Sequence, residues 1–420
     1  MNKYKINKII KIAILLSIGF TFYCFILGSH FNQQLSQPTL HTTIEQQNGK
    51  SVNNNLNYSI NDTTNTLQSQ NLADGTKFVD KEDLTLLISR IGINRTAFSR
   101  GEKDASSYLA SLMENLNLSF YKDQTTFIKE FSVNKNKSQS VIGVKKSSNE
   151  SNKYVILGAH YDNAYSINGE QTNSNGVFDN SSGLLCLIAI MNELNAVDLP
   201  YNIIYIFYGA EEVGLCGSKN FVSSLSSIEK KNILFALNFD SIGIGEETYF
   251  YSGDSNNAYK KIFTNNSNIK EMPTIKRLNL LTNFEGFAYT HIGLMSDNAT
   301  YLKHGIKCTT FFSGNLSHSG SGYIESVNHE NLTHTKNDNI EYILSTYPNF
   351  LNNINNVANL SINVLQTEGL ESTIKNCNNG LDLFFLNNKV VIGAIFLAGI
   401  IILTAIRPHN RNNLGNKQSN

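Results

Sequence analysis

The chain has 420 residues, and its 34 Lys and Arg balance its 34 Asp and Glu, so the formal net charge is zero. A neutral chain in which only 16% of residues are charged gives no reason to expect nucleic acid or an acidic surface as a partner. Its five cysteines form no C-x-x-C pair, so neither a disulfide scaffold nor a cysteine-rich zinc site is predicted.

The first predicted element is an apolar run at residues 12–27, behind the basic leader MNKYKINKIIK. Such a pair is typical of a secretory signal peptide or an uncleaved signal anchor. No clear small-x-small cleavage site follows, which favours an anchor over residues 1–31, with a signal peptide as the alternative. Residues 32–79 are rich in Gln, Asn, Ser and Thr and are predicted to form a low-complexity tether, because they cannot bury enough apolar surface to offset the entropy lost on ordering.

Helical and strand-like patterns alternate through the next segment, residues 80–365, which we predict to be one folded domain. The pattern predicts helices at residues 81–91, 104–116, 184–194 and 298–304, and strands at 154–157, 203–208, 233–237 and 308–312. Strands that alternate with helices indicate an α/β domain in which helices cover both faces of the sheet.

A second apolar run, at residues 390–406, follows a predicted linker at 366–389. The run carries no charged residue and is just long enough to cross a bilayer as a helix. Basic residues lie outside both apolar runs, which places both termini in the cytoplasm, including a tail at residues 407–420. We therefore expect a protein of the cell membrane, in contact with the lipid bilayer at both ends, whose domain at residues 80–365 is extracellular.

Metal-ligand residue types follow three of the predicted strands. His160-Tyr161-Asp162 follows the first, Glu211-Glu212 the second and Asp240 the third. Because ligands of open α/β sheets bind at the carboxyl ends of the strands, these side chains are expected to meet at one edge of the sheet.

Two further segments add one candidate ligand each. Asp179 lies in the segment GVFDNSSG just before a predicted helix, where it could also serve only as a helix cap. His334 lies in a polar loop after the last strand, and His318 and His329 in the same loop are alternatives to it. Imidazole and carboxylate groups together suit zinc, and Glu211 and Glu212 could supply a base and a ligand from one strand end.

The five segments in this order resemble metallopeptidase family 28, the aminopeptidase Y and bacterial leucyl aminopeptidase type. The motifs are H-x-D, D-N-x-x-G, G-A-E-E-x-G-L-x-G-S, N-x-D and S-D-x…H-T, and the resemblance covers roughly residues 91–344. It implies a mixed, largely parallel central sheet with helices on both faces, the fold of zinc exopeptidases. Residues 141–144 resemble the edge strand of that sheet.

The resemblance also implies two zinc ions per chain and a role for each motif residue. One zinc would be held by His160 and Asp240, the other by Glu212 and His334, with Asp179 as the bridge between them.

The same resemblance makes Glu211 the general base, which deprotonates the bridging water and later protonates the leaving amine. Asp162 would orient His160. Where the family often has Tyr before the last histidine, this chain has Thr333. Tyr323 is one candidate replacement, so the oxyanion donor is unassigned.

The resemblance therefore predicts a zinc-dependent exopeptidase that acts on peptide substrates. A short connection between residues 144 and 154 leaves no room for the inserted domain of carboxypeptidase relatives, which favours an aminopeptidase. The alternatives are a glutaminyl cyclotransferase, which uses one zinc, and a non-catalytic receptor or scaffold on the same fold. Neither the oligomeric state nor the side-chain preference is predicted.

Overall fold

The computed structural model describes residues 76–167, 170–245, 247–253, 258–264, 268–272, 295–314 and 332–376. Both apolar runs predicted to lie in a membrane fall outside these ranges, as do most of the predicted tether and the predicted cytoplasmic tail. Across the described ranges, no helix is both long and apolar enough to cross a membrane.

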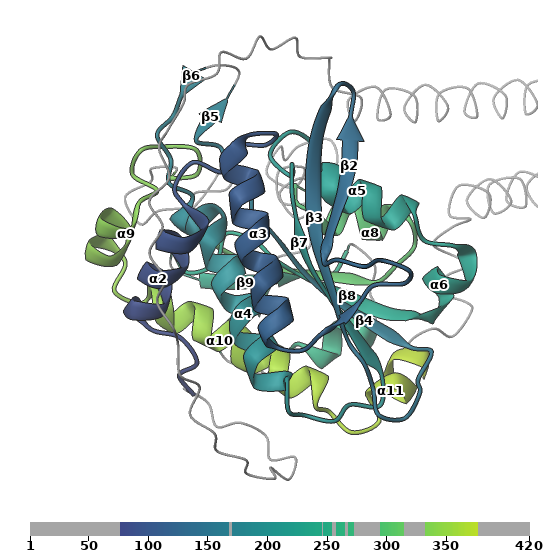
Figure 1. Ribbon diagram of the computed structural model, residues 1–420. Helices are drawn as coiled ribbons and strands as arrows, with labels where there is room; N and C mark the ends of the chain where they lie inside the picture. The colour runs from purple at the N-terminus through teal and green to yellow at the C-terminus, as the bar shows by residue number, and fades with distance from the viewer. Residues whose placement is uncertain are drawn as a thin grey trace, which may run out of the picture. The chain divides into compact units, whose positions relative to one another are not determined.

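Nine strands of the described chain form one mixed sheet (Figure 1). Their order is β1-β3-β7-β4-β8-β11-β9-β10, and β2 also pairs with β3. The central strands β7, β4, β8 and β11 are parallel to one another, whereas β3 joins β7 and β9 joins β11 in antiparallel pairs. This arrangement confirms the predicted mixed α/β sheet.

The strands of the sheet are β1 (Ser119–Phe120), β2 (Ile128–Val133), β3 (Asn136–Lys145), β4 (Tyr154–His160), β7 (Asn202–Tyr208), β8 (Ile233–Phe239), β9 (Glu247–Tyr251), β10 (Ile269–Glu271) and β11 (Cys308–Gly314). A separate small ribbon joins β5 (Ser166–Ile167) to β6 (Glu170–Gln171).

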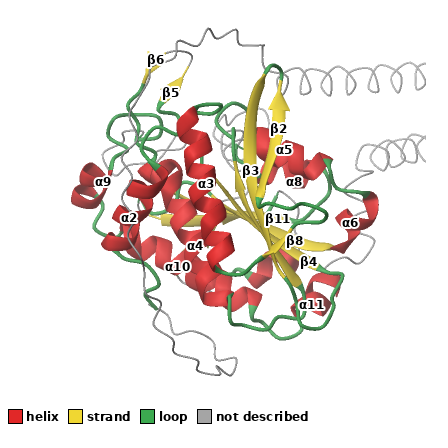
Figure 2. Cartoon of the chain, viewed as in Figure 1, coloured by secondary structure: helices red, strands yellow, loops and turns green. Residues whose placement is uncertain are grey.

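Helices cover both faces of this sheet, as Figure 2 shows. On one face lie α2 (Lys81–Ile91), α3 (Arg100–Asn115), α4 (Ser182–Leu194) and α10 (Phe350–Leu365). On the other lie α5 (Cys216–Ser223) and α8 (Asn298–Lys303). Shorter helices are α6 (Ser227–Asn232), α9 (Ile340–Thr346) and α11 (Leu370–Asn376).

The apolar side chains of the central strands alternate between two cores. Val155 and Leu157 of β4 belong to the core under α3 and α4, whereas Ile156 between them belongs to the core under α5 and α8. Both faces are therefore buried, which explains why the central strands read as continuous apolar runs rather than as an alternation. Helix α4 is apolar at most positions because it lies between the sheet and α10.

Two local expectations need correction. Helix α3 begins at Arg100, ahead of the predicted start at residue 104, because Ser99 caps it by accepting a hydrogen bond from the Glu102 amide at 3.1 Å. The predicted edge strand at residues 141–144 belongs to β3, which is paired on both sides. Val141 and Ile142 are fully buried, as expected of an interior strand.

Candidate metal centre

Three neighbouring parallel strands deliver candidate ligands to the same edge of the sheet. His160 is the last residue of β4 and lies opposite Tyr208, the last residue of β7. Glu211 and Glu212 follow β7 within a short turn, and Asp240 directly follows β8. The meeting of these strand ends is what the sequence predicts, since carboxyl ends of parallel strands share one edge.

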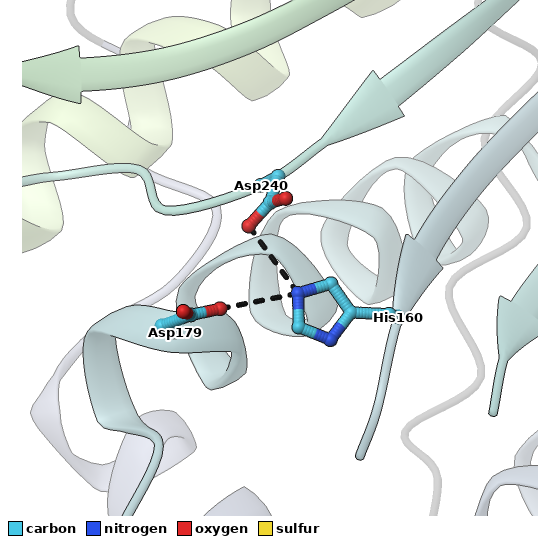
Figure 3. A group of neighbouring side chains, drawn as sticks. All are labelled: His160, Asp179 and Asp240. Atoms are coloured by element: carbon cyan, nitrogen blue, oxygen red, sulfur yellow. Dashed lines mark hydrogen bonds and ion pairs between the residues drawn. The ribbon is translucent and has the colours of Figure 1, made fainter. Parts of the chain in front are cut away.

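The first cluster of candidate ligands contains His160, Asp179 and Asp240 (Figure 3). The Nε2 atom of His160 lies 3.1 Å from Asp179 Oδ1 and 3.3 Å from Asp240 Oδ1. The ring of His160 is 1% exposed, so its position is fixed by the surrounding core. One nitrogen and two carboxylate oxygens that point toward one another can hold a cation between them.

The second cluster contains Asp179, Glu212 and His334. The Nε2 atom of His334 lies 2.8 Å from Glu212 Oε2 and 3.5 Å from Asp179 Oδ2. Asp179 therefore turns one oxygen to each histidine, which is the arrangement a bridging carboxylate requires. The second oxygen of Glu212, Oε1, is buried and lacks a hydrogen-bond partner among the described residues.

The charges of the centre are unbalanced. Four carboxyl groups and two imidazoles line one pocket, namely those of Asp179, Glu211, Glu212, Asp240, His160 and His334. Burial, together with the neighbouring charge of Asp179, raises the pKa of Glu212 to about 7. Burial also raises the pKa of Glu211 well above its usual range. A donor set of this kind fits divalent cations, because they offset the repulsion that accumulates among buried carboxylates.

The two imidazoles respond to these carboxylates. Burial alone lowers the pKa of His334, but its contacts with Asp179 and Glu212 outweigh burial and raise the pKa to about 11. Burial would raise the pKa of Asp179, yet the hydrogen bonds from His160 and His334 hold it well below its usual range. The two imidazoles and the carboxylates are thus held together by ion pairs, and the residues that form these pairs are also the candidate metal ligands.

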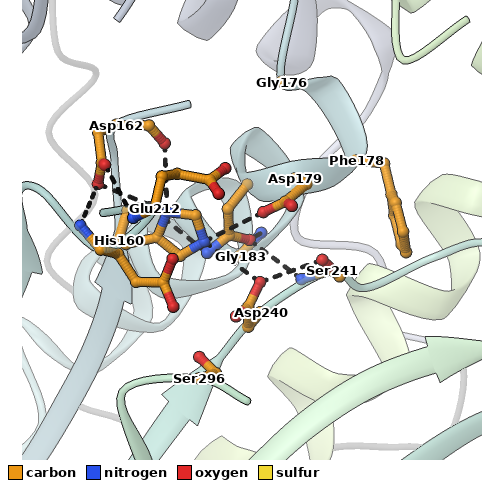
Figure 4. Close-up of polar contacts among 12 residues, drawn as sticks. His160, Asp162, Gly176, Phe178, Asp179, Gly183, Glu212, Asp240, Ser241 and Ser296 are labelled. Atoms are coloured by element: carbon orange, nitrogen blue, oxygen red, sulfur yellow. Dashed lines mark hydrogen bonds and ion pairs between the residues drawn. The ribbon is translucent and has the colours of Figure 1, made fainter. Parts of the chain in front are cut away.

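Asp162 contacts two motifs at once (Figure 4). Its Oδ1 accepts a hydrogen bond from the Glu211 amide at 2.9 Å, and its Oδ2 accepts one from the Glu212 amide at 3.1 Å. The Nδ1 atom of His160 lies 3.2 Å from the Asp162 carbonyl oxygen and 3.7 Å from its Oδ1. The fully buried Asp162 carboxylate therefore holds the Glu211–Glu212 turn, in addition to facing the imidazole for which the resemblance implied a role.

The remaining sequence candidates fall into two groups. Thr333, at the position where the family often has Tyr, lines the pocket beside His334, together with Met295 and Phe312. His318, His329 and Tyr323 lie outside the described residues.

Two residues that support the centre were missed by sequence reasoning. The carboxylate of Asp338, which is fully buried, accepts hydrogen bonds from the amides of Phe178 at 2.6 Å and Asp179 at 3.2 Å. It thereby ties the loop of His334 to the loop of Asp179. Asp338 stands within the His334 motif, so a signal was present, but its role depends on a contact across 159 positions of the chain.

Arg95 is the second missed residue, and its guanidinium is fully buried among the loops of the centre. It donates hydrogen bonds to five acceptors, the carbonyl oxygens of Gly92, Tyr161, Asn175 and Gly176 and the hydroxyl of Ser181. Burial lowers the pKa of Arg95 to about 10, and the charges of Asp338 and Asp162 oppose that shift. Arg95 therefore remains a cation at neutral pH and joins the end of β4 to the Asp179 loop.

Comparison with known proteins gives one family. The sequence profile of peptidase family M28 matches residues 140–359. Aminopeptidase YwaD of Bacillus subtilis is 28% identical over 229 residues, which cover 53% of this chain and 44% of that protein. The probable lipoprotein aminopeptidase LpqL of Mycobacterium tuberculosis is 34% identical over 120 residues, covering 28% of this chain and 22% of the relative. The chain thus spans less than half the length of these relatives.

A solved structure shares the fold. BSAP, a zinc aminopeptidase from Bacillus subtilis, superposes with a TM-score of 0.51 at 17% sequence identity, covering 69% of this chain and 94% of that one. At this identity the likeness concerns the fold, which is the mixed α/β sheet with its helices described above.

The contacts of Arg95 generate a prediction about stability. Arg95→Met removes the buried donor of five hydrogen bonds, so the free energy of unfolding is expected to fall by about 3 kcal/mol or more. Urea-induced unfolding of the metal-free full chain, followed by circular dichroism, measures the change. The matched control is Arg100→Met, because the Arg100 side chain is 81% exposed and its ion pair with Asp104 spans 3.5 Å; a change of less than about 1 kcal/mol is expected there. Equal losses in the two variants would show that Arg95 does not join these loops.

Proposed function

The chain belongs to peptidase family M28, and from that premise we propose that it is a zinc-dependent aminopeptidase that removes N-terminal residues from peptides. One observation carries the proposal. Asp179 lies between two imidazole nitrogens and turns one carboxylate oxygen to each, while Glu211 lines the same pocket. A bridging carboxylate flanked by two ligand clusters and a separate carboxylate are the parts a two-metal hydrolase needs.

We assign His160 and Asp240 to one zinc, Glu212 and His334 to the other, and Asp179 to both. The zinc ions, when bound, would lower the pKa of an attacking water and polarise the scissile carbonyl group. The chain's own contribution is to hold these five side chains in place. The imidazole of His160 is fixed by its burial and by the 3.2 Å contact of its Nδ1 with the Asp162 carbonyl oxygen.

Glu211 is assigned the proton transfers. Its side chain is buried and lines the pocket, and it is not a member of either ligand cluster. A Glu211 carboxylate oxygen takes the proton from the attacking water and then gives it to the nitrogen of the leaving amine. Because Asp162 holds the amides of both Glu211 and Glu212, the neighbouring side chains are free to face different partners.

The assignment as an aminopeptidase rests on two supports. The connection between β3, which ends at Lys145, and β4, which begins at Tyr154, is too short to contain an inserted domain. Relatives from Bacillus subtilis and Mycobacterium tuberculosis carry the name aminopeptidase. The presence of two ligand clusters, rather than one, argues against a one-zinc glutaminyl cyclotransferase and against a scaffold that has lost its ligands.

We also propose that the enzyme is anchored in the cell membrane through residues 1–31 and 390–406, with the catalytic domain outside the cell. The basic flanks of both apolar runs support this orientation. The name of one relative, a probable lipoprotein aminopeptidase, is consistent with an attachment to the membrane.

The metal content of the full chain tests the assigned ligands. About two zinc equivalents per chain are expected by elemental analysis, together with loss of peptide hydrolysis after chelation and recovery on addition of zinc, because the ligands bind metal in their deprotonated forms. Asp179→Asn should lower the content at both sites, since Asp179 contacts both histidines. Hydrolysis that survives exhaustive chelation in a chain free of metal would contradict the proposal.

The different roles of Glu211 and Glu212 can be separated by matched substitutions. Glu211→Gln keeps the size of the side chain but removes the base, so kcat should fall by about 10² to 10⁴ while zinc content and KM stay near those of the wild type. Glu212→Gln should lose zinc from one site as well as activity, because Glu212 lies 2.8 Å from His334. The reverse pattern of zinc loss would mean that the two roles are exchanged. Normal turnover in Glu211→Gln would rule out the mechanism.

Protease protection tests the membrane orientation. Protease added to intact cells should remove the catalytic domain and spare a tag placed after Asn420, because the basic flanks keep both termini inside. The same protease added to permeabilised cells is the control and should remove the tag. A tag that is digested in intact cells contradicts the orientation.

A further inference from the structure

Glu102 is a buried acid outside the pocket. It lies in the first turn of α3, it is 1% exposed, and it does not line the pocket of the proposed active site. A carboxylate is costly to bury unless hydrogen bonds replace its water. Three donors do so here, the Phe98 amide at 2.7 Å on Oε2, and the Ser138 hydroxyl at 2.6 Å and the Ala210 amide at 2.9 Å on Oε1.

The two oxygens of Glu102 have different partners in the fold. Oε2 contacts the chain just before α3, where Ser99 caps the helix, so this contact is local. Oε1 leaves the helix and contacts Ser138 on β3 and Ala210 in the turn after β7, across 36 and 108 positions of the chain. A helix cap requires neither the burial nor the second set of contacts, so capping alone does not account for Oε1.

The Ala210 contact completes a row of three. The amides of Ala210, Glu211 and Glu212, which are consecutive in the chain, each donate to an oxygen of a buried carboxylate. Glu102 accepts the first, and Asp162 accepts the other two, at 2.9 and 3.1 Å. Each of these amides is thus bonded to a side chain from another part of the fold, so the row fixes the path of the main chain through the turn.

The turn needs to be held, because its backbone is under strain. Ala210 has a φ of 53°, a left-handed conformation that a residue with a Cβ adopts at a cost. The residue before it, Gly209, packs so closely that a Cβ there would lie 2.4 Å from the Gln139 carbonyl oxygen and 2.8 Å from Glu102 Oε1. Glu102 therefore contacts the backbone of Gly209 and Ala210 directly, and this backbone sets the direction of the Glu211 and Glu212 side chains.

We propose that Glu102 is a positioning residue, which aims Glu211 and Glu212 into the pocket by fixing the Ala210 amide through Oε1. The inference rests on the proposed function for its effect on turnover. Its effect on metal binding does not depend on which reaction the centre performs.

The first test compares two capping acids in the full chain. Glu102→Gln replaces one acceptor oxygen by an amide nitrogen that cannot accept. Its matched control is Asp83→Asn. Asp83 occupies the equivalent position in α2, where its Oδ2 accepts a hydrogen bond from the Asp80 amide at 2.9 Å, and it does not line the pocket of the proposed active site. We expect kcat of Glu102→Gln to fall by about 10- to 100-fold with KM within about threefold, because removal of such outer partners typically costs that much. Asp83→Asn should keep wild-type kcat.

A second pair of variants separates the reach of the side chain from its chemical type and guards against loss of folding. Glu102→Asp keeps the carboxyl group but is one methylene shorter, so it should lose the Ala210 contact and resemble Glu102→Gln in kcat. Ser138→Ala removes the other hydrogen bond to Oε1 without touching the cap, and a smaller fall in kcat, of at least about twofold, is expected. Wild-type kcat in Glu102→Gln, or wild-type kcat in Ser138→Ala when Glu102→Gln does not fold, would overturn the proposal.

Zinc binding gives a readout that does not require hydrolysis. Titration of the metal-free chain with zinc against a competing chelator should show one of the two equivalents bound about tenfold more weakly in Glu102→Gln, because Glu212 lies in the same turn. Asp83→Asn should bind like the wild type. A wild-type chain that binds zinc but cleaves no peptide would refute the proposed function, while the Glu102 proposal would stand or fall on this titration. Unchanged affinity at both sites in Glu102→Gln would overturn it.

Discussion

Hydrogen bonds from main-chain amides to buried carboxylates are the interaction on which the centre depends. Asp338 holds the amides of Phe178 and Asp179, and Asp162 holds those of Glu211 and Glu212. An ionised carboxylate only accepts hydrogen bonds and can take several donors at once, so it suits a turn whose amides converge. The loops that carry Asp179 and Glu212 are thus fixed through their backbones, which leaves the side chains available to a metal.

This support has an electrostatic consequence. Burial, with repulsion from the neighbouring charges of Asp179 and Asp162, raises the pKa of Asp338 to about 7 and that of Glu102 to about 8. The buried guanidinium of Arg95 opposes that repulsion from behind the Asp179 loop, because its charge faces Asp338 and Asp162. Cations bound at the two clusters would oppose it from the pocket side. Metal binding and the stability of these loops are therefore expected to depend on each other.

The sequence predicted the parts of the centre that follow from strand geometry. Parallel strands place their carboxyl ends together, so His160, the Glu211–Glu212 pair and Asp240 could be expected to meet once the strands were recognised. Glu102 could not be found in this way, because a Glu in the first turn of a helix is also what an exposed capping residue looks like. The prediction that residues 141–144 form an edge strand was wrong for a similar reason. The neighbouring strand β2 is half-exposed and gives only a weak strand signal.

The two ligand clusters differ in what holds them, although they share Asp179. His160 and Asp240 lie at the ends of β4 and β8, and the side chain of His160 is buried in the core and only 1% exposed. His334 comes from a loop, adopts a φ of 62° and has a side chain that is 38% exposed. Its backbone support reaches it indirectly, through Asp338 and the hydrogen bonds of that carboxylate to the Asp179 loop. Ligands at the ends of strands are held in place by the sheet, whereas a ligand on a loop is only as rigid as the contacts that the loop makes with the rest of the protein. The buried acids Asp338 and Asp162 bond the loops of Asp179 and Glu212, so they support the cluster that contains His334.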